Sequence, residues 1–160
     1  MAVRFFLKFA DIKGESKDAK HKDEIEVESY SWGVSQSGSG TPGGGGGAGK
    51  ASFSDFSFTM PQSVASPVLM LACASGKHLK EAQLTARRSG KAGLDYYKLR
   101  FYDLLITSYQ EGGSSGDEFP TESISFNFSK MDMEYRPRNA KGQLGSPATA
   151  SWDLKADKGG

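Results

Sequence analysis

The chain has 160 residues, with 20 lysines and arginines against 19 aspartates and glutamates, which gives a formal net charge of +1. This length is typical of a single domain that can bury a core, and the balanced charge excludes a general attraction to nucleic acid or anionic membranes. The single cysteine, Cys73, excludes an internal disulfide. Arg4 and Lys8 interrupt the apolar N-terminus, so we expect no cleaved signal peptide.

The N-terminal part is predicted to form two strands on either side of a charged segment. Residues 3–9 alternate between apolar and polar, which is typical of a half-buried strand. The charged residues 11–24 indicate a solvated loop, or alternatively a polar arm that lies on another subunit. Residues 24–36 predict one long strand. Its apolar positions change phase, which indicates either a β-bulge near Glu28 or Ser29 or cover on both faces.

A glycine- and serine-rich loop follows at residues 37–49. Gly44–Lys50 satisfies the first seven positions of the phosphate-binding pattern G-x-x-x-x-G-K-[ST], but Ala51 stands where the pattern needs a hydroxyl. The next segment has the alternation of a strand, whereas a phosphate-binding loop leads into a helix. Nucleotide binding is therefore not predicted.

The middle of the chain predicts a strand at 51–60, a short helix at 67–75 and a second strand at 78–88. Ser66 is the expected N-cap, Pro67 suits the first helical position, and Gly76 suits the exit from the helix. The run between them is apolar on nearly every side. We therefore expect a largely buried helix, covered by its own domain or also by a neighbouring subunit, with Cys73 as a small core residue.

The C-terminal part predicts an unusually long strand at 94–109, a second flexible loop at 111–118, and a strand at 121–135. In the last of these, Ile124, Phe126 and Phe128 share one face, and Met131 and Met133 take the other parity. A polar connector, 136–148, then leads to a short final strand around residues 150–154.

These elements predict one domain, 1–160, with flexible loops at about 37–50 and 111–118. The expected fold is mainly β, a small β-barrel of two packed antiparallel sheets with one short α-helix at the side. Several strands are long and carry apolar residues on both faces. Together they present more apolar surface than a lone barrel of this size can bury. Such surface usually marks a subunit interface.

The titratable residues form no recognisable catalytic or metal-binding pattern. His21 and His78 lack a cysteine or a second histidine at ligand spacing. The carboxylates of the predicted strands are scattered singly, and the pair Arg87–Arg88 alone does not make a nucleic-acid surface. We therefore expect no enzyme, no cofactor and no metal.

Several segments, in order along the whole chain, resemble the Hcp family (haemolysin-coregulated protein), the tube component of bacterial type VI secretion systems. They are Ile12–Ser16 (IKGES), Glu24–Val27 (EIEV), Ser31–Gly33 (SWG), Gly47–Lys50 (GAGK), Leu69–His78 (LMLACASGKH) and Ser123–Phe128 (SISFNF). The block at 69–78 is the most specific. Tyr30 departs from the tryptophan that many relatives carry, but it keeps an aromatic side chain.

The resemblance implies hexameric rings with a wide channel, stacked into a tube that a contractile sheath expels behind a spike. It implies that small effectors travel in the ring lumen. The expected partners are further copies of the chain, sheath and spike-tip proteins and small effectors, with no nucleic acid and no membrane insertion. The expected location is the bacterial cytoplasm during assembly, followed by secretion into the medium without a cleaved signal peptide.

Three groups of residues are candidates for these contacts. Small polar side chains suit a hydrated channel wall, although for the later strand outer solvent exposure is the alternative. The lumen or effector-contact candidates are Ser29, Ser31, Gly33, Ser125 and Asn127. The ring-stacking candidates are Lys13, Glu15, Lys17 and Asp18, and the subunit-interface candidates are Trp32 and Tyr97.

Two other classes of function stay open from the sequence. One is a monomeric ligand-binding β-barrel, which predicts an internal cavity for an apolar small molecule among Phe, Tyr and Met side chains. The other is a cytosolic enzyme whose site is assembled from distant residues, which predicts a cleft with strongly perturbed carboxylates or histidines.

Overall fold

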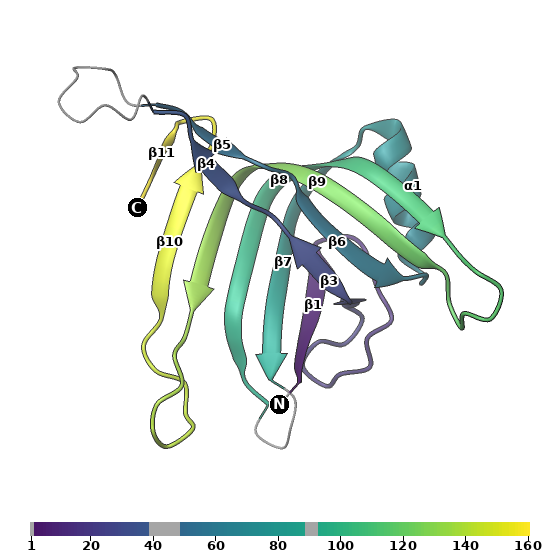
Figure 1. Cartoon of the computed structure of the whole chain (residues 1–160), viewed down its shortest axis with the longest axis horizontal. Helices are drawn as coiled ribbons and strands as arrows, with labels where there is room; N and C mark the ends of the chain where they lie inside the picture. The colour runs from purple at the N-terminus through teal and green to yellow at the C-terminus, as the bar shows by residue number, and fades with distance from the viewer. Residues whose placement is uncertain (1, 39–48, 89–92) are drawn as a thin grey trace.

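The computed structural model describes residues 2–38, 49–88 and 93–160, which form antiparallel strands and one helix (Figure 1). The helix, α1, spans Ser66–Ser75. The strands are β1 Val3–Phe9, β2 Ile25–Val27, β3 Ser29–Ser31, β4 Val34–Gln36, β5 Ala51–Phe53, β6 Phe56–Pro61, β7 His78–Arg88, β8 Asp95–Gly112, β9 Thr121–Tyr135, β10 Ala148–Asp153 and β11 Lys158–Gly159. The strands predicted at 3–9, 78–88 and 121–135 are confirmed with their bounds. Most of the predicted glycine-rich loop, including Gly44–Ala48, lies outside the described residues.

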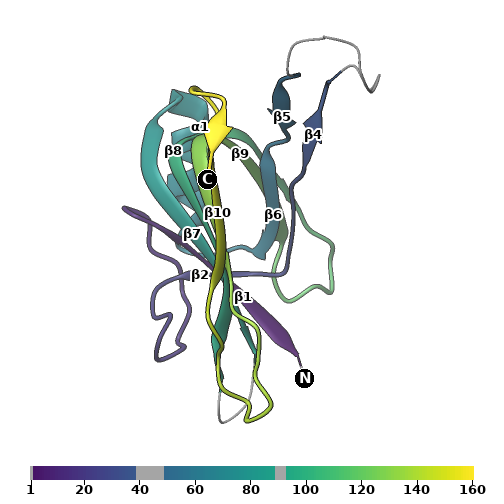
Figure 2. The ribbon, with the colours of Figure 1, turned by 90° about the vertical axis from the view of Figure 1, so that its left-hand side faces the viewer.

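Most strands belong to one strongly curled sheet, in the order β11-β10-β9-β8-β7-β1-β2. The N-terminal half of β9 also pairs with β6, which in turn pairs with β3. β4 and β5 form a separate hairpin that projects from the body (Figure 2). The mainly-β class with one helix is confirmed. The predicted barrel does not close, because β2 contacts β6 without a backbone ladder between them in the described part of the chain.

Phenylalanines from both halves of the curled sheet fill its interior. Phe56, Phe58, Phe101 and Phe126 are each at most 1% exposed. Phe9 of β1 reaches across to Phe126, with ring centroids 5.9 Å apart. Burying large rings in contact with one another is a main source of stability in such a core. The aromatic side chains that a ligand-binding barrel would turn toward its ligand therefore pack on one another.

The predicted strand at 24–36 is wrong, because the chain changes its pairing partner twice. β2 pairs with β1, whereas β3 pairs with β6, and the Glu28 amide donates to the Thr59 carbonyl between them (2.8 Å). The phase change near Glu28 is thus a switch of partner strand and not a β-bulge. After β3, the chain leaves the main sheet and pairs as β4 with β5.

The second predicted phase change, in β9, is confirmed. Phe128 and Met131 are both buried although they are three residues apart. On the neighbouring strand β8, Phe101 and Leu104 show the same change around Asp103, which has a positive φ of 55°. The core-facing side of β8 and that of β9 therefore change at the same level, and each strand keeps buried side chains on both sides of the change.

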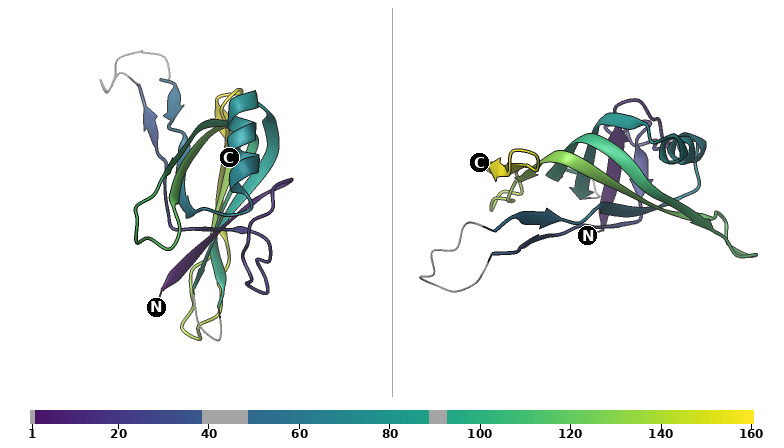
Figure 3. Two further views of the ribbon diagram at one scale, coloured as in Figure 1. Left: turned by 90° about the vertical axis from the view of Figure 1, so that its right-hand side faces the viewer. Right: turned by 90° about the horizontal axis from the view of Figure 1, so that it is seen from above.

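The helix lies along one side of the curled sheet (Figure 3). It differs from the prediction at its start and in its burial. Ala65 occupies the N-cap without a side-chain cap, so the predicted role of Ser66 is wrong, whereas Gly76 ends the helix in the left-handed region as expected. Leu69 and Ala72 are buried, but three apolar side chains of the helix are 45–62% exposed. These are Val68, Met70 and Leu71. The single chain thus covers only one side of α1, and Cys73 packs partly buried at the margin of the core.

Candidate functional site

Two rows of small hydroxyl side chains cross β3, β6 and β9. Ser29 pairs with Thr59 and Thr59 with Ser123, while Ser31 pairs with Ser57 and Ser57 with Ser125. We call these six residues the hydroxyl face. Because side chains alternate along a strand, the residues between them, Tyr30, Phe58 and Ile124, point the other way; Phe58 and Ile124 lie in the core, with Tyr30 half-buried against it.

Hydrogen bonds link four of the six hydroxyls of this face, and the face stays accessible. The Ser29 and Thr59 hydroxyls lie 2.6 Å apart, and those of Ser57 and Ser125 lie 2.8 Å apart. None of the six side chains is buried. A surface of neutral groups that both donate and accept can bind water or a polar partner without selecting for charge. The hydroxyl face is therefore suited to stay hydrated and to bind polar partners weakly.

The structure brings together three of the five lumen candidates, Ser29, Ser31 and Ser125, on this face. Asn127 is exposed one pleat further along β9, and Gly33 lies past the end of β3, hydrogen-bonded to Ser54. Ser57 and Thr59 were missed. The alternation Asp-Phe-Ser-Phe-Thr-Met at 55–60 carries their signal only once β6 is known to lie between β3 and β9.

The charged segment 11–24, which we call the arm, folds back on itself. The Gly14 amide donates to the Asp23 carbonyl (2.7 Å) and the Ser16 amide to the Glu24 carbonyl (3.0 Å). A Cβ on Gly14 would lie only 2.5 Å from the Glu24 carbonyl oxygen, so the close approach requires glycine at this position. The arm is a folded segment and not a loop moving freely in solvent.

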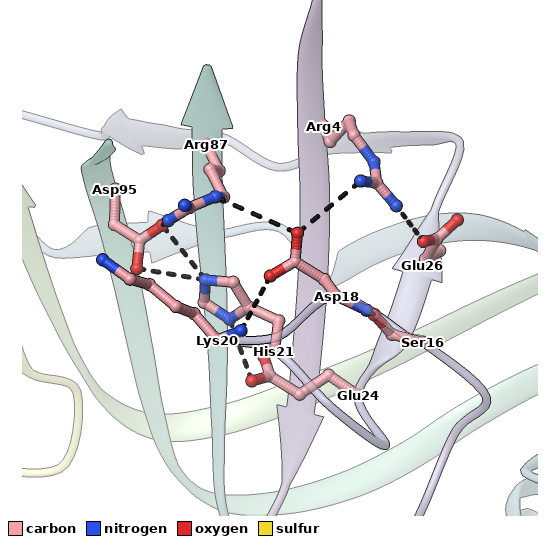
Figure 4. A network of polar contacts seen from close by, with 9 residues as sticks. All are labelled: Arg4, Ser16, Asp18, Lys20, His21, Glu24, Glu26, Arg87 and Asp95. Atoms are coloured by element: carbon pink, nitrogen blue, oxygen red, sulfur yellow. Dashed lines mark hydrogen bonds and ion pairs between the residues drawn. The ribbon is translucent and has the colours of Figure 1, made fainter. Parts of the chain in front are cut away.

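His21 fixes the arm onto its own sheet, as Figure 4 shows. The ring is 5% exposed and stacks on Phe6, with centroids 4.5 Å apart. Its Nδ1 lies 2.9 Å from Glu24 Oε2, and its Nε2 lies 3.0 Å from both oxygens of Asp95 on β8. Arg87 also donates to Asp95 (2.9 Å). Burial favours a raised pKa for Asp95, but the hydrogen bonds from His21 and Arg87 outweigh it and lower the pKa.

Asp18 continues this network, which the sequence did not reveal. Its carboxylate accepts from the Lys20 amide (2.9 Å) and lies 3.6 Å from Arg4 Nη1, and Arg4 also pairs with Glu26. The bond from the Lys20 amide, with the charges of Arg87 and His21, outweighs desolvation and lowers the pKa of Asp18. Among the predicted stacking residues, Asp18 is thus engaged within the chain. The other three are exposed and have no ion-pair partner in the part of the chain that is described: Lys13, Glu15 and Lys17.

The two predicted interface residues are partly buried in their own chain. Trp32 stacks parallel to Phe53 at the base of the β4–β5 hairpin, with centroids 6.4 Å apart. Tyr97 on β8 packs against the core, and burial, together with the nearby Tyr30, raises its pKa to about 12. Each keeps part of its side chain at the surface.

A buried acid was also missed by the sequence reasoning. Glu122 of β9 is fully buried beside the start of α1, where Ser66 donates to Oε1 (2.7 Å) and Tyr109 to Oε2 (2.6 Å). Burial raises the pKa of Glu122, and the two hydrogen bonds offset this only in part. Burial and the hydrogen bond to Glu122 raise the pKa of Tyr109.

Within residues 2–38, 49–88 and 93–160, no group of three or more His, Cys, Asp or Glu side chains is arranged to hold a metal ion. No helix in these ranges is long and apolar enough to cross a membrane.

The filled aromatic core, the exposed hydroxyl face and the charged arm define a mainly-β protein that is suited to contacts along its surface. The chain matches the family model described as type VI secretion system effector, Hcp, over residues 6–135. It is 44% identical over 157 residues to protein hcp1 of Pseudomonas aeruginosa, with 97% of each chain covered.

Solved structures agree with this match. The fold is similar to that of Hcp1 from Salmonella typhimurium, at 37% identity and a TM-score of 0.83 over 99% of each chain. It is also similar to a type six secretion system protein, at 29% identity and a TM-score of 0.91 over 99% of this chain and 100% of that one. The chain therefore belongs to the Hcp family, and it is a structural tube protein of a type VI secretion system.

Proposed function

We propose that six copies of the chain form a ring whose lumen is lined by the hydroxyl face. The observation that carries this proposal is the pair of hydrogen-bonded hydroxyl rows across β3, β6 and β9. Small neutral side chains leave a channel open and hydrated. They also let polar effectors of different charge bind weakly and leave again, which is what a carrier for varied small cargo requires.

The arm supplies the contacts between stacked rings. Lys13, Glu15 and Lys17 project from the arm without an ion-pair partner among the described residues, and the network of His21 and Asp18 keeps their backbone in place. Exposed ion pairs contribute only about 0–1 kcal/mol each. Stacking through such pairs is therefore reversible, which suits a tube that must assemble and later come apart.

Trp32 and Tyr97 serve the contact between neighbours within a ring. Both keep an exposed part next to a rigid, packed part of the same side chain. Aromatic residues held in this way lose little conformational entropy when a partner covers them.

The protein acts without catalysis and without a cofactor or metal. Its partners besides itself are sheath and spike-tip proteins and small effectors, with no part for nucleic acid or membrane insertion. It assembles in the bacterial cytoplasm and is then secreted into the medium.

The lumen assignment can be tested by locating a label in the ring. In a Cys73→Ser background, Ser125→Cys carries a maleimide-linked gold cluster, and Ser75→Cys on α1 is the matched control. We expect averaged electron micrographs to place the Ser125→Cys density at the channel and the Ser75→Cys density away from it. A Ser125→Cys density at the outer rim would contradict the assignment.

A further inference from the structure

The end of β8 and the loop that joins it to β9 carry only acidic charge. Residues 111–119, which we call the acidic loop, are all exposed and contain Glu111, Asp117 and Glu118 without any lysine or arginine. None of these carboxylates forms an ion pair with a described residue. The same loop exposes Phe119, with 56% of its surface accessible. An unpaired acidic segment beside an exposed aromatic ring is suited to a basic partner that also offers an apolar contact.

The connection between β9 and β10 has the opposite charge. Residues 136–147, which we call the basic loop, contain Arg136, Arg138 and Lys141 without any carboxylate. None of the three forms an ion pair with a described residue. The basic loop begins directly after Tyr135, which is 43% exposed and packs edge-on against Tyr96, with ring centroids 6.3 Å apart.

The backbone of the basic loop is ordered by hydrogen bonds within the loop. Asn139 Oδ1 accepts from the amides of Lys141 (3.0 Å) and Gln143 (2.9 Å), and Arg138 forms a β-bridge with Leu144. A surface that is ordered before binding loses less entropy when a partner docks.

The two loops lie at opposite ends of the molecule. In Figure 1 the acidic loop extends beyond α1 on the right, and the basic loop hangs below β9 and β10 on the left. The view from above in Figure 3 shows the same separation along the long axis. They therefore do not neutralise each other within one chain, but each is placed to meet the other on a second copy.

We propose that the acidic loop of one chain docks against the basic loop of the next chain in the same ring, with Phe119 packing beside Tyr135. This inference rests on the proposed ring. The contact joins two different patches, so it is heterologous, and a repeated heterologous contact closes into a ring when the rotation between subunits allows it. Complementary charge at its rim favours this neighbour over a like-charged, inverted pairing.

Charge reversal in the full chain tests the pairing. The acidic reversal is Asp117→Lys with Glu118→Lys, and the basic reversal is Arg138→Glu with Lys141→Glu. Ring dissociation is followed by light scattering in a dilution series. We expect each reversal alone to raise the concentration at which rings dissociate by about 10-fold or more, because attraction becomes repulsion at two positions. We expect the chain carrying all four changes to return to within about 3-fold of the wild type.

Controls with the same change in net charge are Lys77→Glu with Lys80→Glu, and Glu28→Lys with Glu81→Lys, all at exposed positions. These should leave the dissociation concentration within about 3-fold of the wild type, since no charge partner is assigned to them. Two results would overturn the pairing while leaving the ring itself intact. In one, wild-type rings form and neither reversal changes their dissociation concentration. In the other, rings that carry all four changes dissociate at as high a concentration as rings that carry one reversal. A wild type without rings would overturn the proposed function as well.

Discussion

At the scale of single residues, the partly buried Asp95 and the buried Glu122 respond to pH in opposite directions. Asp95 is held ionised by His21 and Arg87, and its pKa lies below the ordinary 3.8. Glu122 is fully buried and its pKa lies above the ordinary 4.5. Folding therefore stabilises the charged form of the first and the neutral form of the second.

Replacing Asp95 by asparagine removes the charge that holds His21 and Arg87. We expect Asp95→Asn to lower the free energy of unfolding at neutral pH by about 1–3 kcal/mol, as for the loss of charged hydrogen bonds. The pKa of Asp95 is lowered in the folded state. The extra stability of the wild type is therefore present above the unfolded-state pKa of 3.8 and is lost as the pH falls through the folded-state pKa. Urea unfolding at several pH values measures this. Asp11→Asn, at an exposed position, is the control, and a difference that persists at low pH would count against the assignment.

Glu122 gives the opposite dependence of stability on pH. Its raised folded-state pKa means that its contribution is fully present below the unfolded value of 4.5 and is lost as the pH rises through the folded value. Glutamine can still accept the hydrogen bond from Tyr109 but carries no charge. We therefore expect the stability of Glu122→Gln relative to the wild type to increase with pH above 4.5. A relative stability that is flat across the same urea titrations would show that the buried group does not titrate as described.

The residue-scale predictions succeeded where a local rule decides the conformation. Gly76 adopts the left-handed region because it must end the helix, and its neighbours in sequence reveal this. Ser66 failed as an N-cap because its hydroxyl donates to Glu122, which lies 56 positions away. His21 was assigned to no site for the same reason, since its partner Asp95 is 74 positions away. Contacts of this kind depend on the fold and leave no local pattern.

At the scale of elements, the arm depends on one glycine. We expect Gly14→Ala to displace residue 14 from the Glu24 carbonyl, because the added Cβ would lie 2.5 Å from that oxygen. The expected loss is about 1–3 kcal/mol of unfolding free energy, the usual cost of overpacking. Faster tryptic cleavage after the lysines of the arm should accompany it.

Gly113→Ala is the matched control for this change. A Cβ there meets Pro120 at an ordinary 3.5 Å, so stability and cleavage should stay near the wild type. Equal behaviour of the two variants would contradict the described packing of the arm.

Strand positions were predictable from alternation, but strand partners were not. The burial of Ile124, Phe126 and Phe128 follows from period 2 alone. Predicting the hydroxyl face requires knowing that β6 lies between β3 and β9. The sequence of a single strand does not show which distant strand it pairs with. The phase change near Glu28 was a correct observation whose cause, a change of partner strand, became visible only in the fold.

At the scale of the whole molecule, the single chain leaves apolar surface uncovered. Val64, Leu71 and Phe119 are each more than half exposed, and all lie near α1 or in the acidic loop. The sequence predicted excess apolar surface, which these exposed side chains confirm; the partner that would cover it stays a prediction. The closed barrel was wrong, because β2 and β6 meet without forming a ladder.

The most direct test of the tube account is the solution mass of the purified wild-type chain, measured by light scattering after size exclusion, with electron micrographs of the same peak. The account predicts the mass of six chains of 17.2 kDa each and rings with an open centre. A single chain's mass at every concentration, with no rings in the micrographs, would contradict it.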